Sequence, residues 1–90
     1  MILLVTYDLH QHGRDYDAIA RTLNTARSSI HPQGSVWIID TDLTPADWRE
    51  KLKAAGDGND EYFIARLQRQ WASFNMGNAA NWLNETARSW

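Results

Sequence analysis

The sequence predicts a small α+β domain with elements in the order strand, helix, strand, strand, helix, strand. Two runs, residues 1–9 and 35–41, are apolar on both alternating faces, which is typical of strands in the middle of a sheet. Two other segments repeat apolar residues at helical spacing, and a Pro-Gln-Gly turn at 32–34 separates the second strand from the third. Because the first and third strands are the central ones, this order is the ferredoxin-like βαββαβ arrangement.

The first strand is expected over residues 1–9, followed by a polar loop that ends at Gly13. Asp15 is placed to cap the next helix, because its carboxylate can accept hydrogen bonds from the free N–H groups of the first turn. The helix should run to about Thr25, with one apolar face that comprises Tyr16, Ile19, Ala20 and Leu23. A short edge strand is expected within residues 26–31.

The second helix has the clearest start signal in the chain. Thr44 is its predicted N-cap, Pro45 its first residue and Asp47 its third, a pattern close to a capping box. Gly56 supplies the stop signal. The fourth strand is expected over residues 61–68, with three side chains directed inward: Phe63, Ala65 and Leu67.

The chain should form one domain of 90 residues, with a core over 1–68 and a C-terminal tail over 69–90. The tail is rich in tryptophan, and its apolar residues share one helical face. A ferredoxin-like sheet carries both of its helices on one face, so the apolar side chains of the other face need cover. Either the tail or a second copy of the chain supplies it, and we expect both.

A homodimer is therefore predicted. The chain contains five tryptophans, and tryptophan is enriched where proteins associate. Either Val36 or Trp37 is expected on the sheet face opposite the helices, and Trp82 on the tail. Trp37 and Trp82 are the predicted interface residues.

Composition excludes several classes of function. The chain has no cysteine, which rules out disulfides, thiolate catalysis and cysteine-ligated zinc. Nine basic and eleven acidic residues give a net charge of −2, without the basic excess of a dedicated nucleic-acid binder. The apolar run at 1–5 is too short to span a membrane and has no basic start, so no membrane partner is predicted and a cytoplasmic location is favoured.

Several short motifs carry a resemblance to known families. The first strand ends in Tyr7-Asp8-Leu9 and the third begins with Ser35-Val36-Trp37, which is similar to the CRISPR-associated Cas-two family. Two more motifs, Gly13-Arg14-Asp15-Tyr16 and Thr41-Asp42-Leu43, resemble bacterial and phage proteins labelled SinR-like. The similarity extends over about residues 1–68.

The resemblance implies a ferredoxin-like homodimer built face to face. In members that cleave nucleic acid, the aspartate at the end of the first strand approaches its twin and holds Mg²⁺; Asp8 would be that catalytic and metal-binding residue here. The chain departs from the family in its acidic charge, in the loop at 9–12 and in its helical tail. These departures favour a binding module over a nuclease.

Other residues suggest chemistry and also have simpler explanations. Asp8 could instead cap a loop. His10 and His12, together with Asp8, could hold a transition metal if the loop is extended, although exposed loop histidines are commoner. Arg14 and Arg27 could contact the phosphates of a nucleic acid, or they could belong to a solvated surface of mixed charge.

Three functions are compatible with these features. The first is a non-catalytic dimeric module that binds a protein or a nucleic acid, linked to defence or mobile elements. The second is a magnesium-dependent endonuclease that acts on RNA or DNA through paired Asp8 residues. The third is a small-molecule binder or regulator, for which the sequence shows no pocket signature.

Overall fold

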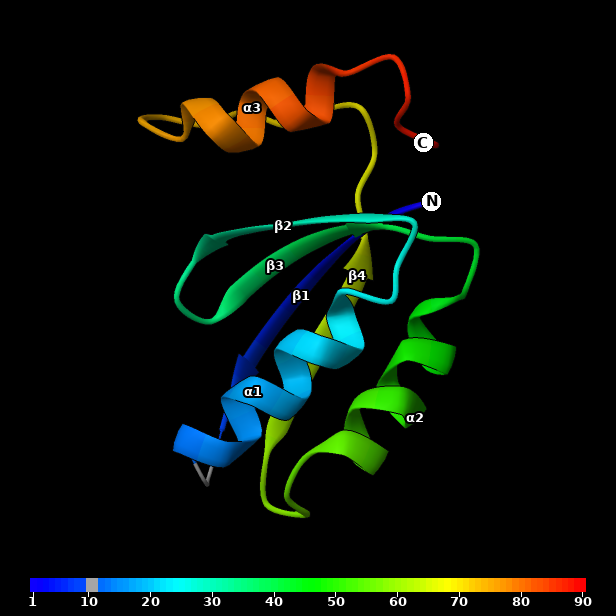
Figure 1. Ribbon diagram of the computed structural model, residues 1–90. Coiled ribbons are helices and arrows are strands. Elements are labelled where there is room, and N and C mark those ends of the chain that lie inside the picture. The colour runs from blue at the N-terminus through cyan, green and yellow to red at the C-terminus, as the bar shows by residue number, and fades with distance from the viewer. Residues whose placement is uncertain (10–11) are drawn as a thin grey trace.

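A computed structural model describes residues 1–9 and 12–90, with side chains described for 1–9 and 16–90. The elements occur in the predicted order, with one further helix in the tail (Figure 1). They are β1 (Ile2–Asp8), α1 (His12–Leu23), β2 (Ser28–Gln33), β3 (Val36–Asp40), α2 (Pro45–Ala55), β4 (Glu61–Arg66) and α3 (Gly77–Asn84).

The four strands form one antiparallel sheet in the order β2-β3-β1-β4. The two strands that are apolar on both faces, β1 and β3, lie in the middle, which confirms the ferredoxin-like α+β fold. The strands pair so that side chains of one face lie opposite one another. Val5 lies opposite Trp37 and Ile64, while Leu4 lies opposite Ile38 and Ala65. Successive residues therefore belong to two separate layers of packing.

The larger core lies between the sheet and the pair α1 and α2. Its fully buried side chains include Leu3, Val5, Ile19, Leu23, Ile39 and Leu52. Trp37 belongs to this core as well: its indole Nε1 donates to the Tyr7 hydroxyl at 3.0 Å. Of the two residues expected on the face opposite the helices, Val36 lies there with Ile38, whereas Trp37 points to the helices, so the prediction of Trp37 as an exposed residue of that face is wrong.

The opposite face of the sheet is covered by the chain's own tail. α3 packs there, away from α1 and α2, as Figure 1 shows. Trp82 is 8% exposed and donates from Nε1 to the Ser28 hydroxyl at 3.0 Å. It lies in a second core with Ile2, Ile38 and Leu83. Trp82 thus contacts its own sheet, one of the two covers expected for this face, and its role at a dimer interface stays a prediction.

Local signals were accurate at α2 and less so elsewhere. Thr44 and Asp47 form the predicted capping box, with both hydrogen bonds at 3.1 Å, and Gly56 is the C-cap. α1 begins at His12, so Asp15 lies inside the helix and is not its N-cap. The inward set predicted for β4 is right only in part: Leu67 packs on the core beneath α3, but Phe63 is 68% exposed. Tyr62 and Ile64, which lie outside the predicted inward set, pack on the helix-side core.

Candidate functional site

Asp8 and Glu61 form a pair of carboxylates at the end of the sheet. Asp8 ends β1, Glu61 begins β4, and the antiparallel register places the two residues directly opposite each other. Cross-strand partners point to the same face, here the face that carries α3. Both residues are exposed, and neither forms an ion pair within the described part of the chain.

The surroundings of this pair are uncovered. The lining of a shallow hollow of about 360 Å³ includes five residues of this face, which we call the open end of the sheet: Thr6, Asp8, Val36, Glu61 and Phe63. None of these residues belongs to the core beneath α3. Figure 1 shows α3 along β2, away from the end of β1 and the start of β4. The tail therefore covers one half of this face and leaves the other half free.

The pair offers part of a magnesium site. Carboxylate oxygens are the ligands that Mg²⁺ prefers, and the ion keeps several waters when few carboxylates bind it. Among the described residues, no cluster of three or more His, Asp or Glu side chains could hold a metal. His10 and the side chain of His12 lie outside the described residues, so the predicted Asp8–His10–His12 set stays a prediction.

The two carboxylates should destabilise the fold slightly, because like charges that face each other across a strand pair repel. We expect Asp8→Asn and Glu61→Gln each to raise the free energy of unfolding by about 0.5 kcal/mol at low salt. The double variant should gain no more than the better single variant, since one removal already ends the repulsion. Urea unfolding measures all three, and additive gains would show that the pair does not interact.

Arg27 and Arg14 are the residues predicted to contact phosphates, and the structure describes the side chain of Arg27 alone of the two. The side chain of Arg14 lies outside the described residues. Arg27 donates to the Asp40 carboxylate at 3.1 Å and also pairs with Asp42. The hydrogen bond and charge of Arg27 hold the pKa of Asp42 below its usual value, and the same contacts raise the pKa of Arg27. The guanidinium of Arg27 thus joins the start of β2 to the end of β3, and its contact with the phosphates of a nucleic acid stays a prediction.

Asp40 is the buried centre of that network, which sequence reasoning missed. Its side chain is inaccessible to solvent and also accepts from the backbone N–H of Ser89 at 2.9 Å. The network joins the end of β3 to the segment after α3. No local motif marks Asp40, because the residue looks like an ordinary polar end of a strand.

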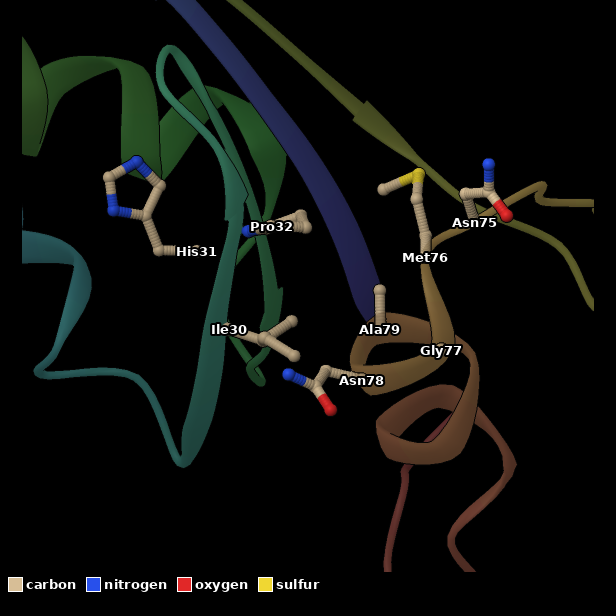
Figure 2. Close-up of a pocket in the computed structure, with 8 residues that line it drawn as sticks. All are labelled: Ile30, His31, Pro32, Asn75, Met76, Gly77, Asn78 and Ala79. Atoms are coloured by element: carbon tan, nitrogen blue, oxygen red, sulfur yellow. The ribbon is translucent and has the colours of Figure 1, made fainter.

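A second hollow lies between β2 and the start of α3 (Figure 2). It has a volume of about 260 Å³, and its lining includes Ile30, Met76 and Ala79. His31 contributes to the wall, but Figure 2 shows its ring on the other side of the strand, where it stacks on Trp37 with centroids 4.4 Å apart. The described residues that line this hollow include no Asp, Glu, Lys or Arg.

Fold and site together describe a ferredoxin-like domain with an acidic pair beside a free sheet surface. The crystal structure of Streptococcus pyogenes Cas2 is similar, with a TM-score of 0.54 and 22% sequence identity over 79% of this chain and 90% of that one. The chain therefore has the fold of Cas2. No family model matches the chain, and the resemblance to SinR-like proteins stays a prediction. No helix in the described ranges is long and apolar enough to cross a bilayer.

Proposed function

We propose that the chain is a CRISPR-associated, Cas2-like protein that works as a homodimer and binds a nucleic acid or a protein without cleaving it. Two observations support the class: the fold of Cas2, and the sequence motifs at the ends of β1 and the start of β3. The dimer and its binding role rest on the open end of the sheet.

The exposure of Phe63 is the observation that carries the proposal. Phe63 is 68% exposed on the edge strand β4, directly opposite the half-buried Thr6, which in turn lies opposite the half-buried Val36. Exposed apolar surface beside a polar rim is typical of a site where another protein packs. A second copy placed across a two-fold axis would cover this surface with the same surface of its own.

The charges around the open end argue for binding rather than cleavage. Asp8 and Glu61 give this surface negative charge, which repels the phosphate backbone of a nucleic acid. Two arginines that could contact phosphates already form ion pairs within the chain: Arg27 with Asp40, and Arg49 with Glu50. A nucleic acid bound by the dimer would therefore meet another surface.

Nuclease activity is the second candidate, and the register of Asp8 and Glu61 favours it. In a face-to-face dimer, two copies of each residue would bring carboxylates close to the axis. Such a group would bind a divalent cation strongly, because the cation removes the repulsion among them. Metal-dependent cleavage would then depend on Asp8.

A cleavage assay decides between the two. Labelled RNA and duplex DNA are incubated with the wild type, with Asp8→Asn and with Asp17→Asn, a matched loss of charge on the exposed face of α1. The proposal predicts no cleavage with Mg²⁺ or Mn²⁺ for any of them. Cleavage by the wild type and by Asp17→Asn that is lost in Asp8→Asn would overturn it and establish the nuclease.

A further inference from the structure

A cavity outside the open end lies between the segment that follows β4 and the end of α3. Its volume is about 330 Å³, at the lower end of the range for small-molecule sites. Its walls include two arginines, two tryptophans and one glutamate: Arg69, Arg88, Trp71, Trp90 and Glu85. Nothing in the proposed dimer uses this cavity.

Arg88 is held in the cavity wall with donors to spare. Its side chain is only 8% exposed, its guanidinium lies 4.2 Å from the centre of the Trp82 ring, and Nη2 donates to Glu85 at 2.9 Å. The other two nitrogens, Nε and Nη1, are buried and have no hydrogen-bond partner in the described part of the chain. Burial of charged donors without acceptors is costly, so this arginine favours an anion beside it.

The charge around the cavity is positive although the whole chain is acidic. Arg69 is exposed and lies 5.3 Å from the centre of the Trp90 ring, and Arg66 donates to the main-chain oxygen of Trp90 at 2.6 Å. Glu85 in the lining offsets the charge of Arg88, and the main-chain carboxylate of Trp90 offsets that of Arg66, so Arg69 supplies the excess positive charge. Local positive charge raises the concentration of anions at such a surface.

We propose that this cavity binds a nucleoside monophosphate. The phosphate lies between Arg69 and Arg88, since the planar guanidinium group suits phosphate oxygens. The base stacks on the half-buried indole of Trp71 or Trp90, because every base has a π face that an aromatic ring accepts. Nε and Nη1 of Arg88 are shielded from solvent, so the segment after α3 shifts when the phosphate enters.

The test follows the indole N–H signals of the five tryptophans by NMR during titration with adenosine 5′-monophosphate. The signals of Trp71 and Trp90 should move most. Binding should be at least about tenfold tighter than for adenosine, which lacks the phosphate, and than for inorganic phosphate, which lacks the base. Equal affinity for either of these two probes, or no binding at millimolar nucleotide, would overturn the proposal.

Variants separate the site from general charge effects. Arg69→Gln should weaken nucleotide binding at least about fivefold and leave the melting temperature unchanged, because the side chain is exposed. The matched control is Arg49→Gln on α2, which removes an exposed arginine that pairs only with its neighbour Glu50 and should leave affinity within about twofold. Arg88→Lys keeps the charge but loses the planar donors, and should weaken binding as Arg69→Gln does. An equal loss in Arg49→Gln and Arg69→Gln would contradict the assigned site.

Discussion

Replacement of Trp82 by alanine is expected to lower the free energy of unfolding by about 3–5 kcal/mol. The indole is buried between α3 and the sheet, and its Nε1 donates to Ser28. Its loss would open a cavity beside Ile2 and Ile38 and leave the Ser28 hydroxyl without this donor. For a domain of this size, the melting temperature should fall by more than about 10 °C.

The matched control is Phe74→Ala, which truncates a large aromatic residue in the same tail. Phe74 is 85% exposed, so its loss should change the free energy of unfolding by less than about 0.5 kcal/mol. Thermal and urea unfolding of the two variants measure the difference. Similar behaviour of Trp82→Ala and Phe74→Ala would mean that the tail does not pack on the sheet.

Replacement of Asp40 by alanine should also be strongly destabilising, by about 1–3 kcal/mol. The carboxylate accepts from Arg27 and from the backbone N–H of Ser89, and the Asp40 side chain is inaccessible to solvent. Its removal leaves that N–H unpaired and detaches the end of the tail from β3.

Asp42→Asn is the control, because Asp42 pairs with the same arginine from an exposed position. Exposed ion pairs contribute little, so Asp42→Asn should lose far less stability than Asp40→Ala. Added salt should remove the small difference in stability between Asp42→Asn and the wild type. If the two variants lost equal stability, the buried carboxylate would not be the centre of the network.

The sequence predicts the fold well where several local signals agree. β1 and β3 are apolar on both faces and therefore occupy the centre of the sheet, and the capping box at Thr44 sets the start of α2. The same double apolarity explains why the sequence left open whether Val36 or Trp37 lies on the face opposite the helices. A strand with two apolar faces does not reveal which face meets the helices, and a shift of one residue exchanges them.

The candidate site could be predicted only in part. Asp8 is conspicuous because it ends a strong apolar strand, whereas Glu61 becomes its partner only through the register of β1 with β4. The position of the tail could not be predicted for a different reason. The apolar helix that carries Trp82 could pack on its own sheet or on the sheet of a second copy, and both would bury the same side chains. The hydrogen bond from Trp82 to Ser28 joins the tail to its own sheet, and this contact is not visible as a sequence pattern.

We propose that a second copy covers the open end of the sheet, and light scattering during size-exclusion chromatography measures whether it does. At micromolar concentration the wild type should have twice the chain mass of 10.3 kDa. Phe63→Asp should elute as a monomer, because it places a charge where the two copies meet, whereas Leu43→Asp, at an exposed apolar residue before α2, should remain dimeric. A monomeric wild type, or a Phe63→Asp variant that remains dimeric, would contradict the account.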